Sequence, residues 1–225
     1  MTTRSVSGIR WARSWRVNPS DLGSRVALLF MVGSALFALG SLPAYAARVD
    51  PRISAGTFFV GSIFFTAAAL GQFDQQIDRT TSGKRNWRDT ARGALFWSAF
   101  VQLIGTFLFN ISTGAAMNTS LDDPDINRLV WAPDMFGSVA FLVASHLAWT
   151  VVCGGWWAVR RDDEDWWISA INYVGSIFFM ASAIASLVLP TGQALNITLV
   201  DLATFLGACC FFLGAYLLLP PPSRS

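Results

Sequence analysis

Six long apolar segments, separated by short polar stretches, divide this chain. They lie at residues 25–45, 55–73, 94–115, 135–156, 168–189 and 197–219. Each is close to the length of about 20 residues that an α-helix needs to cross a hydrocarbon core of about 30 Å. No segment alternates apolar and polar residues as the strands of a membrane barrel do. We therefore predict six membrane-spanning helices, because a helix satisfies its own backbone hydrogen bonds in lipid.

One short pattern recurs in all six segments: glycine, a small residue, two variable positions, phenylalanine, two variable positions and another small residue. The glycine, the phenylalanine and the closing small residue share one face of a helix. Such a stripe suits helix packing in lipid, where association depends on close van der Waals contact. The predicted packing seam consists of Gly33, Phe37, Gly61, Phe65, Gly105, Phe109, Gly137, Phe141, Gly175, Phe179, Gly207 and Phe211.

The spacing of the motif groups the helices in pairs. Successive motif glycines are separated by 28, 44, 32, 38 and 32 residues, so shorter and longer intervals alternate. This alternation predicts three repeated antiparallel hairpins, and it is compatible with pseudo-threefold packing. Antiparallel partners present the motif in opposite directions, so glycine and phenylalanine should contact each other reciprocally. The predicted contacts are Gly33 with Phe65, Gly105 with Phe141, Gly175 with Phe211, and their mirror pairs.

Composition and charge place this all-α protein in a membrane and orient it. Hydrophobic residues make up 53% of the chain, charged residues 13%, and the mean hydropathy is +0.47, which is typical of an integral membrane protein. The formal net charge is only +2, but 13 of the 16 basic residues fall on one side when the termini and the second and fourth loops are placed together. The positive-inside rule then predicts that both termini are cytoplasmic.

The predicted domain organisation follows from these segments. We expect a basic cytoplasmic segment at 1–23, hairpins at 24–73, 93–158 and 167–219, cytoplasmic linkers at 74–92 and 159–166, and a tail at 220–225. In the first segment, Trp11 and Trp15 stand among arginines and would share one helix face suited to anionic lipid headgroups; a loosely ordered basic tail is the alternative. The triplet Ala44, Tyr45 and Ala46 is typical of a signal-peptide cleavage site, but the preceding run carries the common motif, and we expect it to stay as a helix.

The last hairpin carries a resemblance to known proteins. Its helices read NYVGSIFFMASAIASLVLP and DLATFLGACCFFLGAYLLLP. They resemble a group of uncharacterised bacterial multi-pass membrane proteins and, more distantly, the two-helix YrhK-type membrane domain with its Gly-Ser-x-x-Phe helices. The resemblance covers mainly the helices and implies a location in the cell (inner) membrane of a bacterium. It brings no catalytic residues with it.

Polar side chains inside the spans are candidates for a functional path. His146, the only histidine, falls near the middle of the fourth span. Ionisable groups inside a bilayer are costly and usually face protein or a water-filled cavity; a neutral imidazole that bridges two helices is the alternative. Further candidates, for which helix capping or bridging hydrogen bonds are alternatives, are Gln102, Asp134, Asn172, Asn110 and Asp201.

Motifs of enzymes are missing from the sequence. It contains no nucleophile elbow, Walker loop, HExxH helix or glycine-rich dinucleotide turn. We therefore predict no enzyme, no catalytic residue, no cofactor, no metal site and no nucleic-acid partner. The three cysteines and the single histidine show no metal-ligand spacing.

Two functions are considered, and the sequence favours the first, with the second as its alternative. The first is a non-catalytic inner-membrane protein that binds lipid, including anionic lipid at the cytoplasmic face, or a partner protein, which includes a second copy of the chain. The second is a small-solute or proton-linked transporter or channel with a polar path near His146. A transporter requires the polar groups to converge on one cavity, whereas a scaffold leaves them dispersed between closely packed helices.

Overall fold

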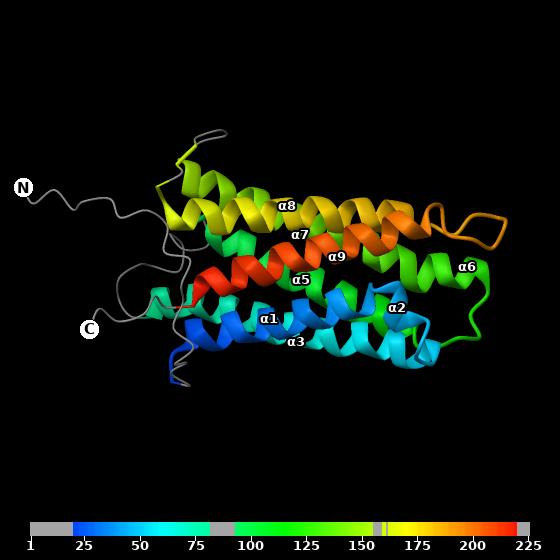
Figure 1. Cartoon of the computed structure of the whole chain (residues 1–225). Coiled ribbons are helices and arrows are strands. Elements are labelled where there is room, and N and C mark those ends of the chain that lie inside the picture. The colour runs from blue at the N-terminus through cyan, green and yellow to red at the C-terminus, as the bar shows by residue number, and fades with distance from the viewer. Residues whose placement is uncertain (1–19, 82–92, 155–158, 161, 220–225) are drawn as a thin grey trace, which may run out of the picture.

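The computed structural model describes residues 20–81, 93–154, 159–160 and 162–219. The regular secondary structure of this part of the chain is helical, and an isolated β-bridge joins Val188 and Ala194. Six of its helices are long and apolar enough to cross a membrane. They are α1 (Leu22–Gly40), α3 (Pro51–Thr81), α5 (Ala94–Ala115), α7 (Ala132–Cys153), α8 (Glu164–Ala185) and α9 (Ile197–Leu218) (Figure 1). The prediction of an all-helical, multi-pass membrane protein is confirmed.

Short elements lie between the long helices at one end of the bundle. They are α2 (Pro43–Ala46), α6 (Asp123–Ile126) and a π-helical turn, η1 (Asn127–Trp131), that leads into α7. We call this end the loop end, and the opposite end, where α1 begins and α9 ends, the terminal end (Figure 1). At the loop end, the Asn127 side chain donates to the Val188 carbonyl at 2.8 Å and accepts from its N–H at 3.0 Å. These two bonds join η1 to the loop after α8.

Three boundaries differ from the predicted ones. Helix α1 begins at Leu22 instead of residue 24, with Asp21 as its cap. Helix α3 continues to Thr81, so the predicted linker at 74–92 is helical in its first part. Hydropathy falls before this helix ends, because the glutamines in its last turns are polar but still good helix formers. Helix α8 begins at Glu164, because the Asp163 side chain caps it by accepting from the Asp165 N–H.

Several predicted segments lie outside the described residues. These are the basic stretch at 1–19 with its two tryptophans, the linker residues 82–92, residues 155–158 and 161, and the tail at 220–225.

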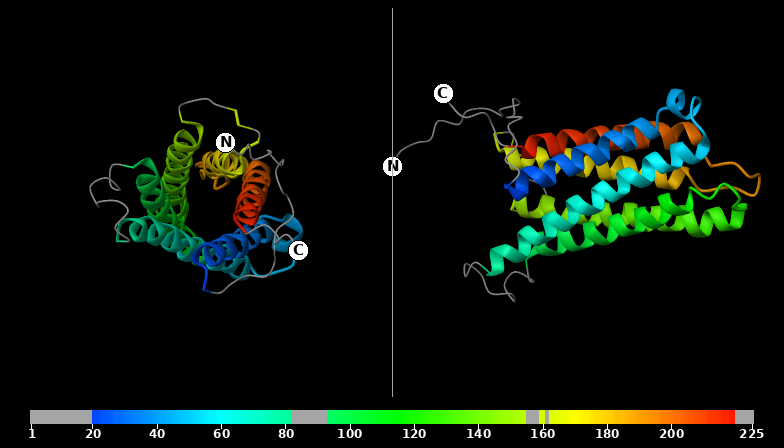
Figure 2. Two further views of the ribbon diagram at one scale, coloured as in Figure 1. Left: turned by 90° about the vertical axis from the view of Figure 1, so that its left-hand side faces the viewer. Right: turned by 90° about the horizontal axis from the view of Figure 1, so that it is seen from below.

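The six long helices form a closed ring (Figure 2, left). Its order is α1, α3, α5, α7, α8 and α9, and α9 packs in turn against α1. Packing is most extensive within three pairs, α1 with α3, α5 with α7, and α8 with α9. Every helix therefore has two neighbours and turns one face toward a common central axis.

The motif glycines allow the paired helices to approach closely. A Cβ atom built on Gly105 would lie 2.8 Å from the ring of Phe141, and one on Gly137 would lie 2.9 Å from the ring of Phe109. Side chains any larger than glycine's would meet these rings. The same reciprocal relation holds in all three pairs, for Gly33 with Phe65, Gly61 with Phe37, Gly105 with Phe141, Gly137 with Phe109, Gly175 with Phe211 and Gly207 with Phe179. These are the contacts that the spacing of the motif predicts.

The six motif phenylalanines meet at the centre of the ring and form two triangles. The rings of Phe37, Phe109 and Phe179 have centroids 5.8 to 6.5 Å apart. Those of Phe65, Phe141 and Phe211 are 5.7 to 6.3 Å apart. The triangles touch within each helix pair, at 5.3, 5.0 and 5.1 Å.

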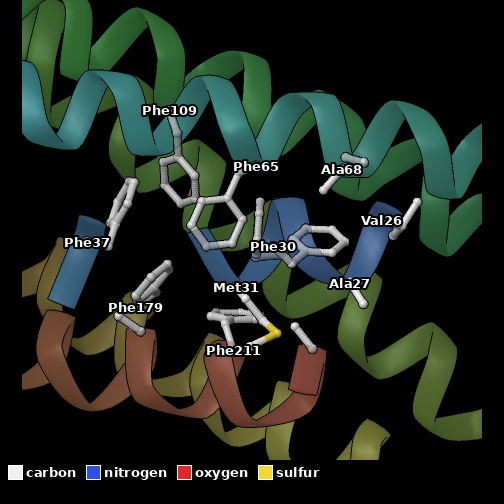
Figure 3. Packing of buried hydrophobic residues seen from close by; sticks show 14 of the residues in the cluster. Val26, Ala27, Phe30, Met31, Phe37, Phe65, Ala68, Phe109, Phe179 and Phe211 are labelled. Carbon is white, nitrogen blue, oxygen red and sulfur yellow. The ribbon is translucent and has the colours of Figure 1, made fainter. Parts of the chain in front are cut away.

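We call this double triangle the phenylalanine plug. All six side chains are buried, and Figure 3 shows Phe37, Phe65, Phe109, Phe179 and Phe211 extending into one shared space. Each helix pair contributes one ring to each triangle. The plug divides the interior of the ring into a terminal half and a loop half.

Candidate functional site

A cavity of about 560 Å³ occupies the terminal half of the ring. Every long helix contributes to its wall, and Phe30 of α1 and Phe211 of α9 are among its lining residues. Because Phe211 also belongs to the plug, the cavity reaches the plug from the terminal side. We call it the inner cavity.

Uncharged polar side chains from four helices line the inner cavity. Two of their atoms, Gln72 Oε1 and Ser169 Oγ, are buried without a hydrogen-bond partner in the described structure. An unpaired buried polar atom is costly, and a polar molecule in the adjoining cavity would supply the missing partner. The polar lining residues are Gln72 and Gln76 of α3, Ser98 and Gln102 of α5, Ser145 of α7, and Ser169 and Asn172 of α8.

Acidic residues border the inner cavity at the terminal end. Asp163 and Asp165 both line it, at the start of α8. The Asp163 carboxylate accepts a hydrogen bond from the Asp165 N–H at 3.0 Å, which holds it at the end of the helix. Among the described residues, every charged side chain that lines this cavity is therefore negative.

A second, smaller cavity of about 30 Å³ lies on the loop side of the plug. We call it the outer pocket. Phe37, Phe109 and Phe179 form one side of it, which shows that this triangle faces the loop end. Its polar lining comes from α7, α8 and α9 and consists of Asp134, Ser138, Ser182 and Thr204.

The hydroxyl groups of the outer pocket are already hydrogen-bonded. Ser182 and Thr204 are 2.7 Å apart, and the Ser182 hydroxyl also lies 3.2 Å from the Val200 carbonyl. Ser138 donates to the Phe179 carbonyl at 3.4 Å. The Asp134 carboxylate differs from them, because no hydrogen bond or ion pair joins it to another described side chain.

Three of the predicted path residues reach the axis. Gln102 and Asn172 line the inner cavity, and Asp134 lines the outer pocket. Asn172 also packs against the backbone of α9, because a side chain at Gly214 would collide with its amide. The plug separates Asp134 from the other two, so the three residues share an axis but not one cavity.

The other three predicted residues lie away from both cavities. Asn110 donates from Nδ2 to the Thr66 hydroxyl at 2.8 Å and so bridges α5 and α3. Asp201 is partly buried on α9 and lines neither cavity. His146 also lines neither cavity, and its Nδ1 lies 3.4 Å from the Tyr173 hydroxyl of α8.

The surroundings of His146 are aromatic. Its ring centroid is 5.9 Å from that of Tyr173, and Tyr173 stacks on Trp149 at 6.2 Å. Trp166 extends this cluster at 5.5 Å from Trp149. His146 therefore belongs to the interface between α7 and α8 and not to the central axis.

Sequence reasoning missed two residues of the inner cavity on α3. Gln72 and Gln76 lie at or beyond the end of the predicted apolar span. The sequence does contain a signal for these two glutamines. Positions 72 and 76 continue the stripe of motif positions 61, 65 and 68 along one face of the helix. Extending the motif toward the terminal end would have placed both glutamines on the axis.

The described residues contain no group of three or more His, Cys, Asp or Glu side chains arranged to hold a metal ion. Comparison of the chain with protein-family models, with curated proteins and with solved structures found no match. The resemblance of the last hairpin to bacterial multi-pass proteins stays a prediction, and function has to be inferred from the two cavities and the residues around them.

Proposed function

We propose that this protein moves a small polar solute across the membrane through the centre of its six-helix ring, as a transporter or channel. The observation that carries the proposal is the inner cavity, where polar side chains of four helices meet on the axis. The convergence that a transporter requires is met here by glutamines and serines together with Gln102 and Asn172, and not by the predicted path residues as a set. Buried polar groups inside a membrane are costly. A protein whose helices only hold one another would disperse them between the helices, as Asn110 and Thr66 are here.

The size and lining of the inner cavity favour a small solute. Its volume of about 560 Å³ falls in the range of ligand pockets, roughly 300 to 1,000 Å³. Gln72, Gln102 and Asn172 offer amide groups, which both donate and accept hydrogen bonds. Phe30 and Phe211 add apolar surface. This combination suits a molecule with both polar and apolar parts, or a hydrated ion.

The phenylalanine plug has the properties of a closed gate. Six buried rings in mutual contact fill this part of the axis with apolar side chains. A hydrophobic constriction of this kind excludes water and so blocks polar solutes. The inner cavity reaches Asp165, an exposed residue at the terminal end. The described conformation thus corresponds to a state that is closed toward the loop end and accessible from the terminal end.

Opening of the gate follows from the arrangement of the helix pairs. Packing is more extensive within the pairs than between them, so each pair is expected to move as one body. Motion of the three pairs against each other would separate the rings of both triangles, since every triangle takes one ring from each pair. This corresponds to alternating access by rigid bodies built from repeats.

The sequence adds an orientation to this proposal. Three hairpin repeats with both termini in the cytoplasm would turn the inner cavity toward the cytoplasm of a bacterial cell. The surrounding lipid, anionic at the cytoplasmic face, is the proposed partner, and no catalytic step is part of the proposed function.

Flux through the reconstituted protein tests the proposal. Entry of glycerol, urea, methylammonium and potassium is measured by light scattering or ion-selective readout in proteoliposomes and in protein-free liposomes. A variant in which Phe65, Phe141 and Phe211 are replaced by alanine is measured beside the wild type, since a closed plug limits the wild type. We expect at least one solute to enter faster with protein than without, and fastest with the variant.

The contrary result is equally clear. If neither the wild type nor the folded triple variant passes any solute above the protein-free rate, the proposal is wrong. The lipid-binding or partner-binding function then becomes the better one.

A further inference from the structure

We infer that the outer pocket binds one small monovalent cation of the ammonium class, ammonium itself or methylammonium, at the Asp134 carboxylate. The inference deepens the proposed function, on which it rests, because the pocket lies on the same axis as the inner cavity, directly beyond the phenylalanine plug. Four observations carry it: charge, aromatic surroundings, oxygen count and size.

The charge of the pocket is unbalanced. Asp134 lies within the span of α7, and no described side chain donates to its carboxylate or pairs with it. The neighbouring elements do not compensate this charge, since Arg128 of η1 does not line the pocket. Asp201 of α9 does not line it either, so it adds no second negative charge there. Asp134 is half-buried, and an ionised carboxylate within a membrane span is unfavourable without a partner. A bound cation would remove this penalty, and an anion would increase it.

The aromatic side of the pocket suits a weakly hydrated cation. Phe37, Phe109 and Phe179 all line it. An ammonium group within about 6 Å of an aromatic centroid is attracted by the ring quadrupole. Combining a carboxylate with several aromatic rings is a way of binding ammonium groups without many oxygen ligands.

The oxygen atoms of the pocket are too few for a strongly hydrated ion. Besides Asp134, the lining offers three hydroxyls, and two of these, on Ser182 and Thr204, are bonded to each other. The Ser138 hydroxyl already donates a hydrogen bond to the Phe179 carbonyl. Calcium and magnesium take about six to eight oxygen ligands in proteins. An ammonium ion needs only a carboxylate and a hydroxyl oxygen to accept from its N–H groups, and the rings can surround the rest.

The size of the pocket limits the ligand. Its volume is about 30 Å³, whereas one water needs at least about 10 to 15 Å³ measured in this way. The pocket thus holds a particle of one or two non-hydrogen atoms, such as ammonium or methylammonium. Larger solutes fit only the inner cavity, so the outer pocket would select what passes the plug.

Equilibrium binding of radiolabelled methylammonium to the purified, detergent-solubilised protein tests the inference. We expect saturable binding of one methylammonium per chain, displaced by unlabelled ammonium and not by an equal concentration of sodium. Asp134→Asn keeps the shape of the side chain and removes its charge, and should weaken binding by about tenfold or more, since a hydrogen bond to a charged group is worth about 1.5 to 3 kcal/mol. Asp201→Asn is the matched control on α9, and its binding should equal that of the wild type.

A second variant keeps the test decisive if Asp134→Asn does not fold. Thr204→Val preserves the volume of the side chain and removes one hydroxyl of the pocket, and we expect it to weaken binding by about threefold, as the loss of one hydrogen bond inside a membrane protein implies. Folding of each variant is checked by size-exclusion chromatography. The inference is overturned if the wild type shows no saturable binding, if every one of these two variants that folds binds as the wild type does, or if sodium displaces methylammonium as well as ammonium does.

The flux assay separates this inference from the proposed function. If methylammonium does not bind but the triple phenylalanine variant passes other solutes, the inference fails and the transport function stands. If binding and all flux are both absent, the two fail together.

Discussion

The ring of Phe37 in α1 rests against the backbone of Gly61 in α3, so closely that a Cβ atom on Gly61 would lie 2.8 Å from a ring carbon. The reciprocal contact is almost as close, with a Cβ on Gly33 at 3.1 Å from the ring of Phe65. Two contacts of this kind fix both the separation and the register of the pair. They also hold both rings on the axis, where the plug forms.

Gly61→Ala is expected to destabilise the protein. The added methyl group meets the Phe37 ring, and overpacking of this kind costs about 1 to 3 kcal/mol. Gly56→Ala is the matched control on the same helix, because its new Cβ would have only Met117 nearby, at 3.9 Å. Thermal unfolding in detergent should show a lower midpoint for Gly61→Ala and an unchanged or higher one for Gly56→Ala. Equal midpoints would show that the seam tolerates a methyl group.

Phe211→Ala is expected to open the plug. It removes one ring of the second triangle, which contacts Phe65, Phe141 and Phe179. Solute flux in proteoliposomes should rise above that of the wild type. Phe212→Ala, at an exposed position one residue along α9, serves as the control and should leave flux unchanged. Similar effects of both substitutions would argue against a gate at the centre of the ring.

Gln102→Leu is expected to reduce flux. Gln102 lines the inner cavity beside Ser98 on α5, and leucine offers a solute no hydrogen bond. In the background of the open Phe211→Ala variant, entry of a hydrogen-bonding solute should fall by about fivefold, because one lost hydrogen bond is worth about 1 kcal/mol. Gln75→Leu, on a glutamine of α3 that does not line the cavity, should keep the parent rate. If Gln102→Leu leaves the rate of the Phe211→Ala variant unchanged, the Gln102 side chain does not contact the solute.

His146→Phe is expected to leave flux nearly unchanged. The histidine lies between α7 and α8, outside the lining of both cavities, and phenylalanine retains the ring contact with Tyr173. Flux of the open variant with and without this substitution, measured from pH 5.5 to 8, should stay within about twofold. A pH dependence that disappears with His146 would instead assign it a role in proton movement.

Substitutions of Asn110 and Thr66 are expected to have non-additive effects on the free energy of unfolding and no effect on solute flux. Their side chains share a hydrogen bond of 2.8 Å between α5 and α3. A double-mutant cycle with Asn110→Leu and Thr66→Val should give a coupling energy of about 0.6 kcal/mol, the average for such bonds in membrane proteins. A coupling indistinguishable from zero would mean that close packing alone joins these two helices.

Rotation about each helix explains which candidate residues reach the axis. With about 100° per residue, a position three residues from a motif glycine lies on the motif stripe. Gln102, Asp134 and Asn172 all stand three residues before such a glycine, and all three line a cavity. Their place on the axis was therefore readable from the spacing.

The remaining candidates fail the same criterion. His146 stands five residues after Phe141, which turns it about 140° away from the stripe. Asn110 directly follows Phe109 and is turned by about 100°. Both side chains consequently meet a neighbouring helix, Tyr173 in one case and Thr66 in the other. Choosing these residues by chemical type and depth alone overlooked their direction.

Local properties of the sequence by itself determined the number of membrane helices, the small-large-small face of each and the pairing of glycine with phenylalanine, because hydropathy and helical periodicity act within one or two helices. Only the tertiary structure decided that α9 packs against α1 and closes the ring, that the six phenylalanines meet in two triangles, and that the polar positions open onto two separate cavities. Closure depends on the packing at all six helix interfaces together. No single segment carries that information, and so the plug and the cavities on either side of it exist only in the assembled ring.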